Sequence, residues 1–471
     1  MKDNINLTTR SEIRNRIWQL SYPAMISMLL QTVYDLVDMA WVGKISQQAI
    51  AAVTIFSTIF WLFLFFNELI GASSVSMISQ NYGKGDTEMT RLVSEQTMSF
   101  KVFMGFISGI FLYFSVNPLL NFYLDNPSTV KLAMDYGYIR IFFLPAMYAS
   151  YSVNTIFRCQ GDPKTPMKIM IISTILNIVL DPILMFEKVP FTNIPGFNMG
   201  VKGAGVATVI SVMVSLIYGL SILLSGKNGI SVSWRGLFKL NFNIDLDLLK
   251  IGLPNALRQF AGGLFMAIMV KFVSHYGDAV ITAVGIIAKL QTFIYMPVNG
   301  LMMGGSIVVG HFLGRREVKN AEISASIASR INFIVMLFFA VLFSIFPQYL
   351  FGIFSNDTEI IKMGKELVPI VTLTIPLSGY AFGRSIVFMG SGYTKPYLIG
   401  SLVSQWMLQL PFVATCVYVL NLSYKAIAFS FPLADVVYFV IIILFFKAGK
   451  WKTMDVTKNL RNWHKFNEKF I

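Results

Sequence analysis

The first apolar run of the chain is IWQLSYPAMISMLLQTVYDLVDMAWVG, residues 17–43. An α-helix needs about 20 mainly apolar residues to cross a bilayer, so this run predicts a membrane-spanning helix. Residues 1–16 before it are polar and basic, without a short apolar core followed by small residues. We therefore expect the run to be the first span of the chain and not a cleaved signal peptide.

The rest of the 471-residue chain has the same character. Hydrophobic residues make up 55% of it and charged residues only 13%, and the mean hydropathy is +0.63. Soluble domains carry about 25% charged residues, so this chain has too few charges to cover water-soluble cores. The composition excludes a soluble enzyme and a disordered chain, and it predicts an all-α polytopic membrane protein.

Runs of spanning length predict twelve transmembrane helices. Their expected ranges are 17–43, 50–80, 98–122, 135–157, 168–187, 203–225, 251–275, 280–310, 331–352, 367–390, 398–420 and 426–447. Between these runs and at their ends, 26 Lys and Arg residues lie on the side of the N-terminus and 7 on the other side. The positive-inside rule therefore predicts that both termini are cytoplasmic, and it accounts for the net charge of +14 without nucleic acid.

The longest hydrophilic stretch between spans divides the chain into two lobes of six helices. The expected parts are an N-terminal segment (1–16), an N-terminal lobe (17–225), a cytoplasmic linker (226–250), a C-terminal lobe (251–447) and a basic tail (448–471). We expect the tail to lie on the anionic inner leaflet of the membrane.

The two lobes repeat one another at a single constant offset. QNYGKGD (80–86) overlies HFLGRRE (311–317), and GDPKTP (161–166) overlies GYTKPY (392–397). The same offset pairs Pro23 with Pro254 and Pro145 with Pro376. Because each repeat has an even number of helices, both share one topology and form a parallel repeat, which favours alternating access between two lobes.

Two polar pairs lie within the spans of the first half. Tyr34 and Asp38 are four residues apart, with Asp35 beside them, and Asn177 and Asp181 are also four apart. Residues at this spacing share a helix face, and carboxylates at membrane depth are candidates for function. Facing each other, the pairs would form a site for H⁺ or Na⁺, whereas the structural alternative is a buried hydrogen bond between Asn177 and Asp38.

Several loop motifs together resemble the multidrug and toxic compound extrusion (MATE) family. The resemblance covers roughly residues 17–447. The motifs are LSYPAMISMLLQTVYDLVDMAWVG, SQNYGKGD, NTIFRCQGDPKTP, STILNIVLDPILMF, GVKGAGVAT and IGLPNAL. The resemblance implies a twelve-helix antiporter that exports cationic or amphipathic compounds in exchange for H⁺ or Na⁺.

The resemblance also assigns residues to the coupling site. The family's helix 1 carboxylate matches Asp38, and its helix 5 Asn and Asp match Asn177 and Asp181, a set typical of the branch that couples through the N-terminal lobe. Tyr34 matches a tyrosine common in that branch, and Asp35 stands where Asn is more usual. If the ion is Na⁺, Asp38 and Asp181 are its expected ligands. The acids that another branch carries on helices 7 and 10 are absent here.

Further polar residues within the spans are candidates for a substrate cleft. Lys271 and Arg384 give the second lobe a positive sign, for an anionic group or for interfacial snorkelling. Gln405 and Gln409 follow Ser401 in a stripe that lines a cleft or joins helices. The first lobe contributes Asn154, Tyr138 and Glu68, the last being a relay group, a cleft residue or a partner of Arg140.

These observations predict a secondary active multidrug efflux antiporter, with a lipid-linked oligosaccharide flippase of the same superfamily as the alternative. An enzyme is not expected, because the sequence lacks paired histidines, a phosphate loop and a nucleophile elbow. We expect no cofactor beyond the coupling ion H⁺ or Na⁺. The expected partners are small organic substrates and the lipid bilayer, and the chain is expected to be a monomer in the plasma membrane.

Overall fold

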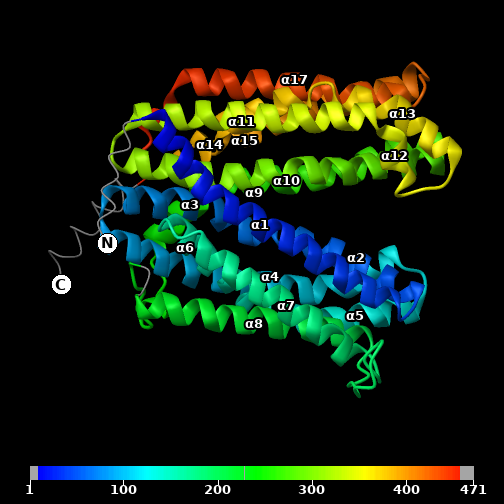
Figure 1. Cartoon of the computed structure of the whole chain (residues 1–471), viewed down its shortest axis with the longest axis horizontal. Helices are drawn as coiled ribbons and strands as arrows, with labels where there is room; N and C mark the ends of the chain where they lie inside the picture. Colours follow the sequence, from blue (N-terminus) through cyan, green and yellow to red (C-terminus); the bar gives the residue numbers. More distant parts are fainter. Residues whose placement is uncertain (1–8, 227–228, 457–471) are drawn as a thin grey trace. The chain divides into compact units, whose positions relative to one another are not determined.

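The computed structural model describes residues 9–226 and 229–456 and shows a helical protein (Figure 1). Within these residues the β contacts are limited to one isolated bridge between Lys188 and Pro195. The ends of the predicted N-terminal segment (1–8) and tail (457–471), and two residues of the linker (227–228), lie outside the described residues.

Residues 9–226 form eight helices. They are α1 (Arg10–Gly43), α2 (Gln47–Phe63), α3 (Phe65–Lys84), α4 (Thr87–Tyr123), α5 (Pro127–Phe142), α6 (Leu144–Cys159), α7 (Lys164–Met185) and α8 (Val201–Ser225).

The second half follows a short 3₁₀ turn, η1 (Gly236–Phe238). Its elements are α9 (Phe242–Val273), η2 (Ser274–Tyr276), α10 (Asp278–Gly314), α11 (Val318–Ile345), α12 (Pro347–Gly352), α13 (Thr358–Thr372), α14 (Ile375–Ser391), α15 (Lys395–Ser401), η3 (Leu402–Gln409), α16 (Leu410–Ala414), η4 (Thr415–Val419), α17 (Lys425–Ala448) and η5 (Lys450–Thr453). Two of these, η3 and η4, are π-helical turns within one long span.

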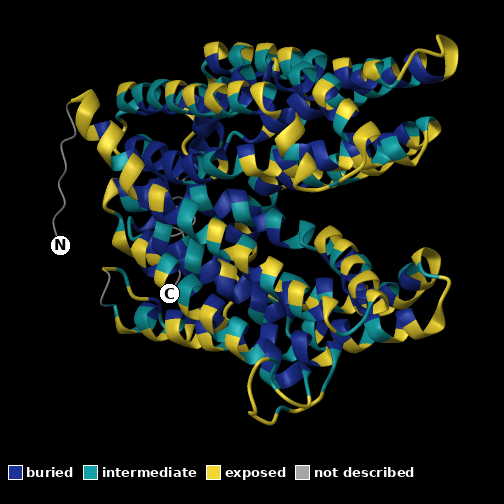
Figure 2. Ribbon diagram, turned by 45° about the vertical axis from the view of Figure 1, so that its right-hand side comes forward, coloured by how far each residue is buried: buried dark blue, intermediate teal, exposed yellow. Residues whose placement is uncertain are grey.

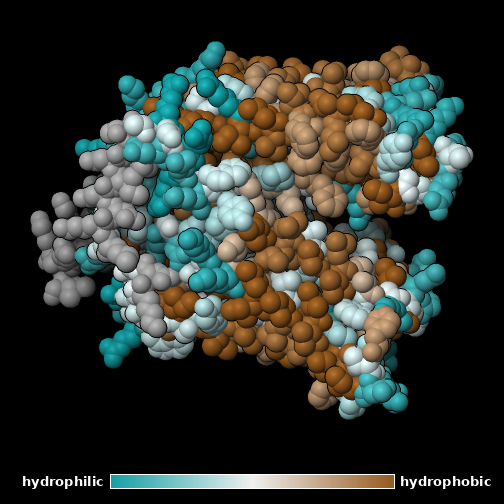
Figure 3. All heavy atoms as spheres, viewed as in Figure 1, coloured by the Kyte–Doolittle hydropathy of each residue, from teal (hydrophilic) through white to brown (hydrophobic). Residues whose placement is uncertain are grey.

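These elements account for all twelve predicted spans. Within the described residues, nine helices are long and apolar enough to cross a membrane, and α2 with α3 forms a tenth span bent by 47°. The two remaining predicted spans, 135–157 and 367–390, fall on α5 with α6 and on α13 with α14, so each consists of two short helices in sequence. On the face seen in Figure 3, hydrophobic residues cover the middle of the helices and hydrophilic residues gather toward their ends, as expected of a polytopic membrane protein.

Two spans predicted as continuous helices, 135–157 and 367–390, are broken at equivalent positions. The first break is at Phe143, between α5 and α6, and the second lies at Leu373 and Thr374, before α14. Pro145 and Pro376 stand in the first turns of α6 and α14. Proline lacks the amide hydrogen that would continue the preceding helix, so the same break recurs at the matching place in the second repeat.

The break between α2 and α3 has a different cause. No proline lies near Leu64, but the carbonyl of Phe63 accepts hydrogen bonds from the Tyr148 hydroxyl at 2.7 Å and the Ser108 hydroxyl at 3.3 Å. Side-chain donors that engage a backbone carbonyl disturb the hydrogen-bond ladder of the helix and bend it. The predicted span 50–80 is therefore two helices because of residues on α4 and α6.

The chain divides into two compact units. The first unit comprises Ile26–Gly252, and the second comprises the described residues 9–25 and 253–456. Each has its own apolar core, in the first around Phe56 and Tyr148 and in the second around Leu290 and Phe351. In Figure 2, buried residues lie on helix faces turned toward neighbouring helices and exposed residues lie on the opposite faces and in the loops.

The beginning of α1 is built into the second unit. A side-chain carbon added to Gly304 of α10 would lie 2.3 Å from the Ser21 hydroxyl, so only glycine allows this close approach. The beginning of α9 packs in the same way within the first unit, where Gly252 meets the backbone of Leu69 on α3. The offset that pairs Pro23 with Pro254 also pairs Ser21 with Gly252, so the repeat extends to this contact.

Candidate functional site

The carboxylate of Asp38 is buried in the first unit. Asp38 lies near the end of α1 and is 7% exposed, and Tyr34 one turn earlier is equally buried. The helical period places both side chains on the same face of α1. The Tyr34 hydroxyl faces Thr208 of α8. A buried carboxylate is costly without hydrogen-bond donors or a cation, so the surroundings of Asp38 decide what it does.

A tyrosine and an arginine of α5 stand next to Asp38. The Tyr136 hydroxyl donates a hydrogen bond to Asp38 Oδ2 at 3.4 Å. Arg140, one turn further along α5, donates from Nη1 to the same hydroxyl at 2.5 Å, and its guanidinium lies 4.6 Å from the centre of the Phe60 ring. Tyr136 therefore links the charge of Arg140 to the carboxylate of Asp38.

The second polar pair lies on α7. Asn177 and Asp181 are both fully buried, and Asn177 Nδ2 donates to Asp181 Oδ1 at 3.1 Å. The carboxylates of Asp181 and Asp38 are close enough to interact electrostatically. The structure therefore brings the two sequence-predicted pairs together in the first unit. Asn177 donates its hydrogen bond to Asp181. The alternative interpretation of the sequence, a hydrogen bond between Asn177 and Asp38, predicts a different partner.

Three buried carboxylate and amide oxygens of this group have no hydrogen-bond partner among the described residues. They are Asp38 Oδ1, Asn177 Oδ1 and Asp181 Oδ2. Carboxylate and amide oxygens are hard ligands, which suit Na⁺, and a carboxylate oxygen equally takes up a proton. In the described part of the chain, no three His, Cys, Asp or Glu residues are grouped to hold a metal ion, so a cation here would depend on the two carboxylates and neutral oxygens.

Asp35 differs from its neighbours on α1. Its side chain is exposed and accepts a hydrogen bond from Gln31 Nε2 at 2.9 Å. The structure thus places the predicted coupling residue Asp35 at the edge of the site, and the buried carboxylates are Asp38 and Asp181.

The cleft candidates of the first half lie on three different helices. Glu68 follows the break at Leu64 and accepts a hydrogen bond from Asn67 at 3.2 Å. Arg140, its proposed partner, instead contacts Tyr136. Asn154 of α6 is half-buried, and its Oδ1 has no hydrogen-bond partner in the ranges that the structure describes. Tyr138 is exposed on α5 with its ring 5.7 Å from that of Tyr113.

The glutamine stripe of the second half joins helices. Gln405 accepts a hydrogen bond from Ser401 at 2.7 Å, and the buried Gln409 donates to Ser430 of α17 at 3.1 Å. Residues 402–409 form a π-helical turn, whose wider period keeps residues four apart close to one line. The bond from Gln409 to α17 favours the packing alternative for this residue.

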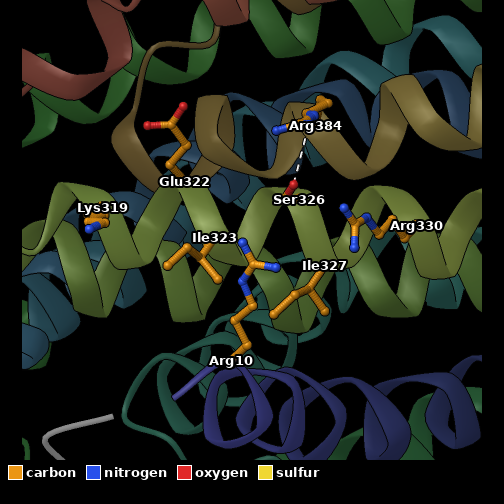
Figure 4. Close-up of a pocket in the computed structure, with 8 residues that line it drawn as sticks. All are labelled: Arg10, Lys319, Glu322, Ile323, Ser326, Ile327, Arg330 and Arg384. Atoms are coloured by element: carbon orange, nitrogen blue, oxygen red, sulfur yellow. Dashed lines mark hydrogen bonds between the residues drawn. The ribbon is translucent and has the colours of Figure 1, made fainter. Parts of the chain in front are cut away.

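The two cations of the second half lie in different surroundings. Lys271 is exposed in the last turn of α9. Arg384 of α14 is half-buried and donates to the Tyr380 hydroxyl at 2.8 Å, and it lines a cavity together with Arg10 (Figure 4). Lys271 does not line that cavity, so the two do not form one binding surface.

Sequence reasoning missed three residues of the buried group. Tyr136 and Thr208 are not among the residues predicted from the sequence, and Arg140 is named there only as a partner of Glu68. Tyr136 and Arg140 are four residues apart, the same spacing that drew attention to the pairs on α1 and α7. That spacing was the available signal for α5, whereas nothing in the sequence marks Thr208.

Known proteins resemble this chain over most of its length. "Probable multidrug resistance protein YoeA" of Bacillus subtilis is 24% identical over 459 residues, which is 96% of this chain and 98% of that protein. "Multidrug export protein MepA" of Staphylococcus aureus is 24% identical over 79% of this chain and 80% of its own.

A solved structure shares the fold. It is described as the outward-facing conformation of a multidrug resistance MATE family transporter of the MOP superfamily. It matches with a TM-score of 0.84 at 22% identity, covering 93% of this chain and 95% of that one.

The MatE family model matches the chain twice, over residues 23–183 and 254–415. The two matches begin at Pro23 and Pro254, a pair that the internal repeat superimposes, and together they cover well over half of the chain. The chain belongs to the MatE family, with one copy of the family's sequence unit in each half.

Proposed function

We propose that this protein is a multidrug efflux antiporter of the plasma membrane that exports cationic or amphipathic organic compounds in exchange for H⁺ or Na⁺. Membership in the MatE family and the names of the relatives, a multidrug export protein among them, support efflux of small organic molecules. The charge bias of the loops supports cytoplasmic termini, with lobes at 17–225 and 251–447 joined by the linker 226–250.

The observation that carries the coupling part of the proposal is the pair of buried carboxylates Asp38 and Asp181. Each has one oxygen bonded to a neutral donor and one buried oxygen without a partner in the described part of the chain. Two desolvated carboxylates close together repel each other when both are charged. The site therefore favours uptake of a positive ion, which would bind to the carboxyl groups of Asp38 and Asp181.

Both coupling ions fit the chemistry of this group. A proton would sit on one of the carboxyl groups, and Na⁺ would take oxygens of Asp38, Asp181 and Asn177 as ligands. Tyr34 and Thr208 border the group with hydroxyls. Because the second half repeats the first, we infer that ion binding in the first lobe drives alternating access of the pair of lobes.

The test is efflux of a fluorescent cationic dye from cells that lack their own pumps. We expect the expressed protein to lower the cellular dye content. The proton gradient and the Na⁺ gradient are then dissipated separately, and the one whose loss abolishes efflux identifies the coupling ion. Asp38→Asn and Asp181→Asn should each reduce the initial efflux rate at least tenfold, whereas Asp35→Asn should reduce it less.

Two results would count against the proposal. Efflux that survives both Asp38→Asn and Asp181→Asn would show that coupling does not use this group. If no dye moves but the purified protein transfers a lipid-linked oligosaccharide across a vesicle membrane, the flippase alternative is correct. The flippase alternative is retained because arginines line a cavity in the second half, where an anionic group could bind.

A further inference from the structure

The second unit contains a cavity of about 370 Å³ between the beginning of α1, α11 and α14. Figure 4 shows Arg10 extending from α1 toward Ile323 and Ile327 of α11, with Arg384 on α14 beyond them. Its lining residues are Arg10, Lys319, Glu322, Ile323, Ser326, Ile327, Arg330 and Arg384. Four of these side chains are cationic and one is a carboxylate.

The single carboxylate of the cavity is already neutralised. Glu322 Oε2 forms an ion pair of 3.0 Å with Lys452 of η5. Arg10, Lys319 and Arg330 form no ion pair with any residue in the described ranges 9–226 and 229–456. The cavity therefore holds an excess of positive charge that the described residues do not compensate.

Arg384 is the deepest of the four cations. Its Nη2 donates to the Tyr380 hydroxyl at 2.8 Å and to the Ser326 hydroxyl at 3.4 Å, and its guanidinium lies 4.6 Å from the centre of the Phe446 ring. All these contacts are with neutral groups. No carboxylate of the described residues pairs with this half-buried guanidinium, which is costly, and an anion in the cavity would remove this cost.

The cavity wall formed by α11 is amphipathic. Lys319, Ile323, Ser326 and Arg330 recur at spacings of three and four residues and lie along one helix face. Isoleucines stand between the cations, so a ligand meets apolar surface next to positive charge. Arg384 and Arg330 present planar groups with several N–H donors, a geometry that matches the oxygens of phosphate.

Topology alone does not account for this arrangement. Positive residues that set orientation need only lie on the cytoplasmic side, in any loop. Here cations from three separate helices converge on one cavity, and one of them, Arg384, lies within a predicted span. The charge bias places this end of the helices on the cytoplasmic side, where the leaflet is rich in anionic lipids.

We propose that this cavity is a binding site for a phosphate group carried by an anionic ligand, with the headgroup of an anionic phospholipid of the inner leaflet as the favoured source. The volume suits a phosphate with its glycerol, and Ile323 and Ile327 would contact the apolar part. The cavity belongs to the second unit, whereas Asp38 and Asp181 belong to the first. The phosphate-site proposal can therefore be tested independently of the coupling proposal.

Native mass spectrometry of the purified full-length protein in detergent tests this. Phosphatidylglycerol and phosphatidylcholine of equal chain length are added separately. We expect one phosphatidylglycerol to be retained and phosphatidylcholine to be lost. The double variant Lys319→Ala/Arg330→Ala should retain at least fivefold less phosphatidylglycerol. Both side chains are exposed without ion pairs in the described part of the chain, so the variant should fold, which size-exclusion elution and the thermal unfolding midpoint will check.

A matched control removes the same charge elsewhere. Lys164 and Lys168 at the beginning of α7 are exposed, lie on the same predicted side of the membrane and belong to the first unit. Lys164→Ala/Lys168→Ala should retain phosphatidylglycerol within twofold of the unaltered protein.

Inorganic phosphate and glycerol 3-phosphate distinguish the source of the phosphate group. Each is added at millimolar concentration to the unaltered protein and to Lys319→Ala/Arg330→Ala. If one of them displaces the lipid or raises the thermal unfolding midpoint of the unaltered protein only, the site accepts soluble phosphates as well, and the proposal holds. Equal retention of the two lipids, or equal loss in the two double variants, together with no response to soluble phosphate, overturns it.

Discussion

The hydroxyl of Tyr136 links Arg140 to Asp38. It accepts a hydrogen bond from Arg140 Nη1 at 2.5 Å and donates one to Asp38 Oδ2 at 3.4 Å, so α5 meets the buried carboxylate of α1 through one oxygen. Removing this oxygen would leave both charges in place and break the connection between them. The variant Tyr136→Phe therefore separates the role of the link from the role of the charges.

Tyr136→Phe should impair transport moderately. A hydrogen bond of this kind contributes about 0.5–1.5 kcal/mol, and about 1 kcal/mol corresponds to roughly fivefold in an equilibrium constant. We expect the concentration of coupling ion that gives half-maximal efflux to change by about fivefold, with the protein still folded. Tyr113→Phe is the control, because Tyr113 is exposed on α4 and has ring contacts only, among the described residues. An unchanged ion dependence in Tyr136→Phe would exclude the link from coupling.

Asn177 and Asp181 should act as one unit. Asn177→Leu keeps a similar volume but removes the donor to Asp181 Oδ1, and we expect efflux to fall at least tenfold. Asp181→Asn should have a similar effect. Residues that share one interaction show non-additive changes, so the double variant should be no worse than the more impaired single variant. If the fold-loss of efflux in the double variant equals the product of the two single fold-losses, the two side chains act separately.

The contact between Gly304 and Ser21 should be sensitive to a single methyl group. Gly304→Ala would place a carbon 2.3 Å from the Ser21 hydroxyl and 2.6 Å from its backbone nitrogen, which forces α1 away from α10. Overpacking of this kind typically costs about 1–3 kcal/mol, so the thermal unfolding midpoint of the purified protein should fall. Gly285→Ala in the same helix is the control. Apart from its chain neighbours and the backbone of its own helix, no atom of the described residues lies within 4 Å of the added carbon, so the midpoint should not fall.

Glu366, which lies just before the predicted span 367–390, joins α13 to α17 in a pH-dependent way. Its Oε2 accepts a hydrogen bond from the Tyr424 hydroxyl at 2.7 Å and pairs with Lys425 Nζ at 3.2 Å. The Tyr424 hydroxyl, followed by Lys425, holds the pKa of Glu366 below its usual value. A depressed carboxyl pKa stabilises the fold above the pKa of the unfolded chain, and this contribution is lost as the pH falls through the folded value.

The measurement is the unfolding midpoint of the unaltered protein and of Glu366→Gln at pH 7 and at pH 3.5. The difference should be present at pH 7 and smaller at pH 3.5, because the contribution declines below the pKa of the unfolded chain and is lost as the folded carboxyl group takes up a proton. Glu359→Gln makes the same charge change on the same helix, at an exposed residue, and should alter neither midpoint. A difference that persists at pH 3.5 would show that the ionised form of Glu366 is not what stabilises the contact.

The number of spans and the duplication were readable from the sequence because both depend on local properties. Each of the twelve apolar runs corresponds to one helix or to consecutive helices, and the offset that pairs Pro23 with Pro254 recurs in the two matches of the MatE model. The sequence did not reveal that the span 50–80 is bent, because Tyr148 and Ser108, which engage the carbonyl of Phe63, lie on other helices. The prolines of the other two breaks were visible, but proline is also common within continuous membrane helices, so it did not predict a break.

The sequence alone determined which residues of one helix face the same way. Tyr34 with Asp38, and Asn177 with Asp181, follow from the fixed 3.6-residue period of the α-helix. Only the tertiary structure decided that Tyr136 reaches Asp38 across 98 positions of sequence and that Arg10 lines a cavity with Arg384. Such contacts depend on how each helix is rotated and tilted, and the packing of a whole unit sets those angles, because no local sequence rule fixes them.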